Sequence, residues 1–207
     1  MIQSRYPIPA ESQRSEIEVK HSRFITSIEA TDTTETALNF ISRIKHEFPD
    51  ASHNCWAYLI GSPGSTDRIG LSDDGEPHGV AGKPMLTIIQ HSGIGDIAVV
   101  VTRYFGGTKL GKGGMVKAYT QAVKTALEQL KTTEKINWVE LSIKVNYRLL
   151  DSIERLLPEF ESELTDKQFA EQICLTLKLP AENLTYLRTR LTDLSSGQIE
   201  FQKPEDF

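Results

Sequence analysis

The chain has 207 residues, of which 39% are hydrophobic and 25% charged, so it is long enough for one large or two small soluble domains. No apolar run approaches the roughly 18 residues that a membrane span requires, and residues 1–12 lack the pattern of a secretory signal. We therefore expect a cytoplasmic protein without membrane partners, whose two cysteines, Cys55 and Cys174, are reduced.

The net charge of −5 is unevenly distributed along the chain. Residues 136–207 hold 8 basic and 13 acidic side chains, whereas residues 1–135 hold 15 of each and are neutral. Long-range attraction of nucleic acid by the whole protein is therefore not expected, and any binding of a polyanion would depend on a local basic patch.

The first predicted elements are strands followed by a helix. Residues 1–14 form a polar lead-in, and the apolar spacing of residues 15–29 predicts two short strands or one bent strand. Thr33 or Thr34 is a suitable N-cap for a helix that ends at Pro49.

The next segment predicts two strands, two loops and a helix. A strand, a turn-rich loop and a short return strand are expected in residues 53–71, followed by a glycine-rich loop at 72–84 whose first residues are acidic. The apolar residues that follow Pro84 predict a helix that stops before Gly93.

The most distinctive stretch is residues 96–130. A β-branched run at 97–101 predicts a strand, a loop with five glycines follows, and a helix is expected from Met115 to about Lys131. From Ile97 to Leu127 there are five basic residues and no Asp or Glu. This strand–loop–helix unit is a place where phosphate or another anion could bind.

The residues after this unit predict a second domain. Residues 131–135 read as a polar connector, so we predict domains of residues 1–134 and 135–207. The order β-α-β-β-α-β in the second domain is the ferredoxin-like pattern. We therefore predict an α+β protein made of two α/β-sandwich domains.

The central loop nearly matches a Walker A motif. Gly106, Gly111 and Lys112 supply its GxxxxGK frame between a strand and a helix. Gly113 stands where Ser or Thr would bind Mg²⁺, so a nucleotide hydrolase is not expected. Two interpretations stay open: a loop whose N–H groups, helix N-terminus and cationic side chains bind phosphate, or a tight connection that needs positive φ.

Arg103, Tyr104 and Phe105 place aromatic rings beside the basic loop. Arg103 offers a bidentate fork to phosphate, and an exposed ring would stack on a base. Alternation puts Arg103 and Tyr104 on opposite faces, so at least one is expected to point into the core. Phe105 is also expected to pack there.

An acidic motif precedes the second predicted helix: Asp73, Asp74, Glu76 and His78. Paired carboxylates can share a cation or hold unlike pKa values, which would make this a metal or acid–base site. Since CxxC and recurring His spacing are absent, we favour an acidic turn and predict no catalytic residue, metal ion or cofactor. The loop could also face the basic loop, with Lys83 and Lys112 as partners.

Several motifs together resemble the signature of the IMPACT/YigZ family, in its bacterial YigZ-type branch. They cover most of residues 15–130 and comprise HNCWA at 53–57, SDDGEP at 72–77, GKP at 82–84, RYFGGTKLGKGG at 103–114 and KAY at 117–119. The resemblance implies an N-terminal domain like those of ribosomal proteins and domain IV of elongation factor G. It also implies a ferredoxin-like C-terminal domain similar to domain V of that factor.

We expect a protein that binds nucleic acid, namely structured RNA or the ribosome, in connection with translation or its regulation, rather than an enzyme. The acidic C-terminal domain is expected to orient it or to meet a protein partner. Alternatives are a nucleotide- or phosphometabolite-binding protein or enzyme whose acidic loop holds a metal ion, and a protein-interaction module. The predicted nucleic-acid or anion contacts are Lys83, Arg103, Tyr104, Gly106, Gly107, Lys109, Gly111, Lys112, Gly113, Gly114 and Lys117.

Overall fold

The structure, a computed structural model, describes residues 4–202. They form two compact units that divide between Lys135 and Ile136. Both units combine α-helices with an antiparallel sheet, so the protein is α+β. None of the helices described is long and apolar enough to cross a membrane.

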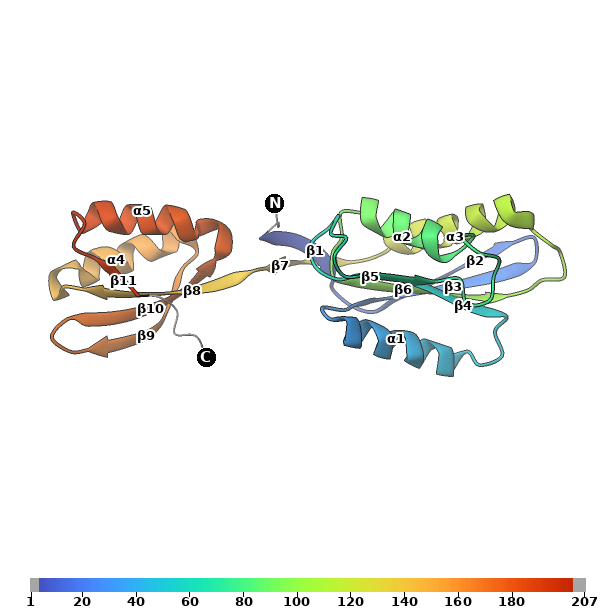
Figure 1. The fold of residues 1–207 in the computed structure, drawn as a ribbon, viewed down its shortest axis with the longest axis horizontal. Helices are drawn as coiled ribbons and strands as arrows, with labels where there is room; N and C mark the ends of the chain where they lie inside the picture. The colour runs from blue at the N-terminus through green and yellow to red at the C-terminus, as the bar shows by residue number, and fades with distance from the viewer. Residues whose placement is uncertain (1–3, 203–207) are drawn as a thin grey trace. The chain divides into compact units, whose positions relative to one another are not determined.

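The first unit is built on a five-stranded sheet with the order β2-β3-β6-β4-β5, in which all neighbouring strands are antiparallel. Helix α1 covers one face of the sheet, and helices α2 and α3 cover the other (Figure 1). The bounds are β2 (Gln13–Val19), β3 (Ser22–Ala30), α1 (Thr34–Glu47), β4 (His53–Leu59), β5 (Ile69–Ser72), α2 (Gly82–His91), β6 (Ile97–Tyr104) and α3 (Gly111–Glu128).

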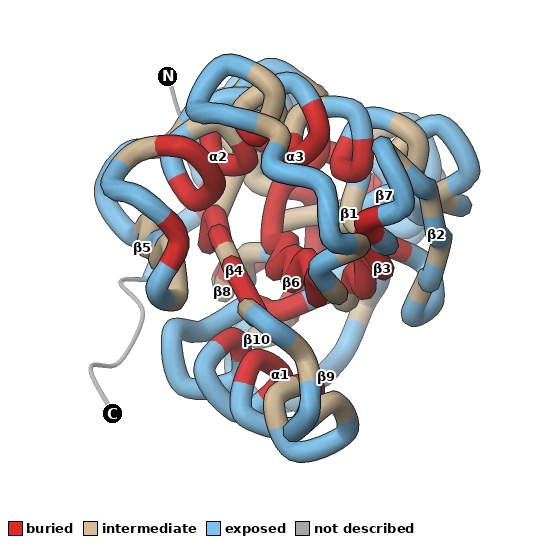
Figure 2. The backbone as a smooth tube through the Cα atoms, turned by 90° about the vertical axis from the view of Figure 1, so that its right-hand side faces the viewer, coloured by how far each residue is buried: buried red, intermediate tan, exposed pale blue. Residues whose placement is uncertain are grey.

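Strand β6 lies at the centre of this sheet because it is apolar on both faces. Val99 and Val101 belong to the core that includes α2 and α3, whereas Ala98 and Val100 belong to the core that includes α1. All four are fully buried, and Figure 2 shows β3, β4 and β6 running through the buried interior. The strand ends directly before the glycine loop.

The helix boundaries follow from local capping. Thr33 caps α1, because its hydroxyl accepts the N–H of Thr36 at 3.1 Å while the Thr36 hydroxyl accepts the N–H of Thr33 at 3.1 Å.

Helix α3 begins at Gly111, four residues before the predicted start at Met115. The glycines at 111, 113 and 114 are therefore the first helical turn and not part of the loop.

A two-stranded sheet that the sequence did not predict joins the ends of the first unit. Strand β1 (Arg5–Pro9) pairs with β7 (Thr132–Ile136), where a polar lead-in and a connector were expected. Asp96 supports both strands, since its carboxylate accepts hydrogen bonds from Tyr6 Oη at 2.9 Å and from Lys135 Nζ at 2.5 Å. Two short strands far apart in sequence pair too non-locally for a periodicity argument to find them.

The second unit has the element order that the sequence predicted, β-α-β-β-α-β. Its antiparallel sheet has the order β11-β8-β10-β9. The predicted strand from Phe160 begins later, because residues 157–160 form a 3₁₀ turn that ends at Glu161 with positive φ. The bounds are β8 (Trp138–Val145), α4 (Leu150–Leu156), β9 (Glu163–Phe169), β10 (Ile173–Pro180), α5 (Leu184–Leu194) and β11 (Glu200–Phe201).

Candidate functional site

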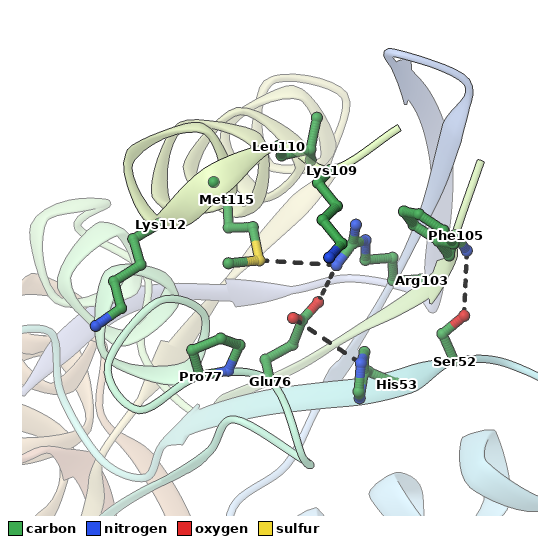
Figure 3. Close-up of a pocket in the computed structure, with 11 residues that line it drawn as sticks. Ser52, His53, Glu76, Pro77, Arg103, Phe105, Lys109, Leu110, Lys112 and Met115 are labelled. Carbon is green, nitrogen blue, oxygen red and sulfur yellow. Dashed lines mark hydrogen bonds and ion pairs between the residues drawn. The ribbon is translucent and has the colours of Figure 1, made fainter. Parts of the chain in front are cut away.

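A pocket of about 370 Å³ opens between the end of β6, the acidic loop after β5 and the N-terminus of α3. Figure 3 shows the residues that line it, with Phe105 and Lys112 at opposite sides of the view. Glu76 and Pro77 of the acidic loop and Lys109 and Lys112 of the basic segment line the same space. The acidic loop therefore faces the basic one.

The base of the pocket is a buried ion pair between Arg103 and Glu76. Nη1 of Arg103 lies 2.5 Å from Oε1 of Glu76, and the same oxygen accepts a hydrogen bond from Tyr119 Oη at 2.8 Å. The guanidinium also lies over the rings of Phe24 and Phe105, at 5.5 and 5.7 Å from their centroids. Arg103 is only 5% exposed, so it is not the free phosphate fork that the sequence suggested.

The Arg103–Glu76 pair is linked by hydrogen bonds to two further buried groups, the Tyr119 phenol and the Cys55 thiol. Sγ of Cys55 lies 3.3 Å from Tyr119 Oη. Burial raises the pKa of the Cys55 thiol to about 12, against the smaller effect of its hydrogen bond to Tyr119. Burial also raises the pKa of the Tyr119 phenol, and the neighbouring Cys55 and Glu76 act in the same direction. Both groups therefore stay protonated at neutral pH.

The first aspartate of the acidic loop fixes the loop backbone. Asp73 accepts the N–H groups of Gly79 at 2.8 Å, Ala81 at 3.0 Å and Gly82 at 2.9 Å. Burial opposes ionisation of Asp73, but these hydrogen bonds outweigh it and hold its pKa below the usual value. His78 is fully exposed, with Nδ1 3.8 Å from the Asp73 carboxylate.

The second aspartate is bound in the same way. Asp74 accepts the N–H of Asn54 at 2.7 Å and pairs with Lys45 at 2.5 Å, not with Lys83 or Lys112. Burial again opposes ionisation, and the hydrogen bonds from Lys45 and Asn54 hold the pKa of Asp74 below its usual value. Within residues 4–202, no three His, Cys, Asp or Glu side chains form a group suited to a metal ion. The acidic motif thus supports the fold of the loop.

Three of the five glycines are explained by the path of the chain. A Cβ on Gly106 would lie 2.0 Å from the carbonyl of His21, and Gly107 and Gly111 have φ of +82° and +69°. Gly113 has open space around it, and a Cβ on Gly114 would lie 3.2 Å from Leu110 Cβ. The tight-connection interpretation therefore accounts for the loop but not for Gly113.

The N-terminus of α3 has free hydrogen-bond donors. Its N-cap residue is Leu110, and no side chain caps the helix. The N–H groups of the first turn, at Gly111, Lys112 and Gly113, have no partner within the helix. They carry the positive end of the helix dipole at the side of the pocket.

The basic side chains of the first unit fall into two groups. Arg5, Arg14, Arg23, Arg43, Lys45, Arg103, Lys131 and Lys135 all form ion pairs. Within the described residues, no carboxylate pairs with the exposed Arg68 or with the exposed lysines Lys20, Lys83, Lys109, Lys112, Lys117 and Lys124. Unpaired cations are thus concentrated on α3 and the segments beside it.

Four of these lysines line two neighbouring hollows. Lys109 and Lys112 line the pocket, and Lys20 and Lys117 line a second hollow of about 590 Å³; Leu110 borders both. We call Lys20, Lys109, Lys112 and Lys117 the lysine strip. Lys83 lies in the first turn of α2 and lines neither hollow. Lys20 was missed because it lies in the β2–β3 turn, far from α3 in sequence.

The two aromatic residues after Arg103 differ in exposure. Phe105 is 51% exposed, so the prediction that it packs in the core is wrong. Its N–H is held by Ser52 Oγ at 3.1 Å, which fixes the backbone while the ring stays open to solvent. The Tyr104 hydroxyl donates to Asp50 at 2.8 Å, and its ring packs against Arg23. Phe105 is therefore the more accessible ring.

Comparison with known families identifies the chain. Residues 20–127 match the Impact N-terminal domain, a range that contains every residue lining the pocket. The chain belongs to the IMPACT family. Residues 143–198 match a second family model, described as a domain of unknown function (DUF1949). The two matched ranges fall on the two structural units.

The similarity to IMPACT-family relatives extends over nearly the whole chain, which is a YigZ-type member. It is 40% identical to the IMPACT family member YigZ of Escherichia coli (strain K12), covering 96% of this chain and 98% of the relative. It is 32% identical to the IMPACT family member YvyE of Bacillus subtilis (strain 168), covering 94% and 89%. A crystal structure described as that of "an hypothetical protein" is 38% identical, with a TM-score of 0.69 and full coverage of both chains.

Proposed function

We propose that this protein binds the phosphate backbone of RNA through the lysine strip, in connection with translation or its regulation. The observation that carries the proposal is the separation of paired and unpaired basic residues. Within the described residues, eight other basic side chains of the first unit pair with carboxylates, whereas the four lysines of the strip have no carboxylate partner. When exposed lysines without partners bind phosphates, counterions condensed on the nucleic acid are released, which favours binding.

Two further groups suit the same ligand. The free N–H groups of Gly111, Lys112 and Gly113 can donate hydrogen bonds to a phosphate at the helix N-terminus. The exposed ring of Phe105 can stack on a base beside that phosphate. In this proposal Arg103 stabilises the pocket and does not bind phosphate, because its guanidinium is already bound to Glu76.

The architecture supports RNA as the polyanion. The second unit has the element order and the strand order of a ferredoxin-like domain, as in domain V of elongation factor G. The first unit resembles ribosomal-protein and domain IV sandwiches in combining an antiparallel sheet with helices. With 13 acidic against 8 basic residues, the segment 136–207 suits a basic protein partner rather than RNA.

A salt titration tests the proposal. Fluorescence anisotropy of a labelled single-stranded RNA should give a binding constant that falls linearly with salt on logarithmic axes. The double variant Lys109→Ala/Lys112→Ala removes two phosphate contacts, so the slope should fall by about 1.4, at about 0.7 per contact. Weaker binding should be uniform across RNA sequences.

The matched control is Arg68→Ala/Arg190→Ala, which removes the same charge from two exposed residues outside the lysine strip. We expect the control to keep the wild-type slope. Negligible binding by wild type at low salt, or equal losses in both double variants, would contradict the proposal.

The pocket also supports a second candidate, a protein or enzyme that binds a nucleotide or a phosphometabolite. Its volume of about 370 Å³ falls within the size range of small-molecule sites. A metal held by the acidic loop is less suited to it, because Asp73 and Asp74 are already bound by donors. Calorimetry with nucleotides, with and without Mg²⁺, distinguishes this candidate: heat that depends on Mg²⁺ would favour it.

A further inference from the structure

The polar groups at the base of the pocket include two hydrogen-bond acceptors that face each other without a donor between them. Nδ1 of His53 lies 2.8 Å from the carbonyl oxygen of Asp74. A carbonyl oxygen only accepts, so Nδ1 carries the proton, and in the neutral ring Nε2 has the lone pair. Nε2 lies 3.9 Å from Oε2 of Glu76, which is too long for a hydrogen bond.

Neither acceptor receives a hydrogen bond from the described residues, although the Glu76 side chain is only 3% exposed. Oε1 of Glu76 accepts hydrogen bonds from Arg103 Nη1 and Tyr119 Oη, whereas its Oε2 accepts no hydrogen bond from the described residues. His53 is 26% exposed at its side chain and lines the pocket with Glu76. A ligand that enters the pocket therefore meets two acceptors side by side.

A donor without an acceptor lies next to this pair. Nη1 of Arg103 is bound to Glu76 and contacts Met115 Sδ at 3.8 Å, but its Nε is buried and has no hydrogen-bond partner within residues 4–202. An unpaired buried donor is costly. Because Nε is shielded, we assign the contacts of a ligand to the two acceptors and not to this donor.

The remaining walls suit a flat aromatic ring attached to a phosphate. Pro77, Leu110 and Met115 supply apolar surface, and the half-exposed ring of Phe105 lies at the rim (Figure 3). Lys109 lines the same pocket and carries no ion pair with a described residue. The pocket therefore combines apolar walls, a polar base and a cation for phosphate.

We propose that this pocket takes the base of an unpaired guanine nucleotide, a specificity that rests on the RNA-binding function proposed above. Guanine carries two adjacent donors, N1–H and the N2 amino group, next to the acceptor O6. The two donors match Nε2 of His53 and Oε2 of Glu76. Phe105 stacks on the exposed face of the base, and Lys109 binds its phosphate.

The other bases fit less well. Adenine and cytosine present one amino donor beside a ring nitrogen acceptor, which would oppose a lone pair of the protein. Uracil presents a single N–H between two carbonyl acceptors. Each leaves one of the two protein acceptors without a donor, and unmatched buried polar groups discriminate strongly between ligands.

The test uses labelled seven-nucleotide RNAs with three uridines on each side of a central G, A, C, U or inosine. Fluorescence anisotropy with the wild-type protein should give a Kd about tenfold lower for central G than for A, C or U. Inosine lacks the N2 amino group, so it should bind at least about threefold more weakly than G. This comparison needs no mutation and therefore no assumption about folding.

A variant tests the acceptor on the protein. His53→Ala should lose the preference for G while keeping the affinity for the all-uridine RNA within about twofold. The matched control is His91→Ala, because the ring of His91 is exposed and its Nδ1 also bonds to a backbone carbonyl, that of Thr87 at 2.7 Å. That control should keep the preference.

The outcomes separate the two proposals. Equal Kd values for all central bases would overturn the guanine site and leave RNA binding intact, as would inosine binding as tightly as G. Absence of binding to every RNA at low salt would overturn RNA binding itself. Free GMP and AMP are added as competitors: displacement by GMP at concentrations near the RNA Kd would assign the guanine site to the free nucleotide, and displacement only far above it would assign the site to RNA.

Discussion

Nη1 of Arg103 lies 2.5 Å from Oε1 of Glu76, and both residues are buried. Arg103 comes from β6 and Glu76 from the loop after β5, so the pair ties that loop to the centre of the sheet. Each charge depends on the other, because a buried charge without its partner is strongly destabilising. The shape of the candidate pocket depends on this pair.

Removing both partners should therefore cost less than the sum of the costs of removing each one alone. Glu76→Gln and Arg103→Met should each lower the free energy of unfolding by about 3–5 kcal/mol. The double variant should lose clearly less than the sum of the two. Urea unfolding followed by Trp56 fluorescence in a Trp138→Phe background measures this in the first unit, and additive losses would contradict the coupling.

The glycine loop offers a matched pair of alanine substitutions. Gly106→Ala places a Cβ 2.0 Å from the backbone of His21 and should destabilise the first unit by about 1–3 kcal/mol. Gly113→Ala has open space in the first turn of α3 and should stabilise by about 0.5–1 kcal/mol. Thermal unfolding of the two variants compares them, and equal melting temperatures would refute the role given to Gly106.

The carboxylate of Asp73 makes the acidic loop sensitive to low pH. Its pKa is lower in the folded protein than in the unfolded chain, so its contribution is present above the unfolded pKa of about 3.9 and is lost as pH falls through the folded value. Asp73→Asn should lower the unfolding free energy at pH 7 by about 1–3 kcal/mol. Urea unfolding between pH 7 and 2 should give a flatter profile for the variant; parallel profiles would exclude this linkage.

Cys55 should resist alkylation in the folded protein. Its side chain is fully buried, and its pKa is raised to about 12, so little thiolate exists at pH 8. Iodoacetamide at pH 8 should modify Cys174, which is partly exposed, much faster than Cys55. Mass spectrometry of the two cysteine peptides measures the difference, which should vanish in urea. Fast modification of Cys55 without denaturant would disprove its burial.

Local patterns in the sequence were sufficient for most of the fold. The helical spacing from Ala37 to Ile44 and the cap at Thr33 located α1, and the β-branched run from Ile97 located β6. Each of these two signals comes from residues that lie close together in the sequence. The pairing of β1 with β7 was not predicted, because it depends on tertiary contacts such as the hydrogen bonds of Asp96 to Tyr6 and Lys135.

The candidate site was predicted only in part for the same reason. The absence of acidic residues from Ile97 to Leu127 indicated Lys109, Lys112 and Lys117 as anion contacts, and that role stays a prediction. Arg103 was wrongly taken as free for a ligand, because a partner 27 positions away, Glu76, cannot be recognised from spacing. Lys20 and His53 reach the two hollows only through the folding of the sheet.

Strand β1 leaves the ribosome first, yet its partner β7 is made only after the whole five-stranded sheet. During synthesis the N-terminal strand must therefore remain unpaired while the sheet and α3 fold, since domains fold from the N-terminal end as they emerge. Asp96 can bind Tyr6 at that stage, and Lys135 joins later. The first unit therefore cannot be completed until β7 has been made, immediately before the first strand of the second unit.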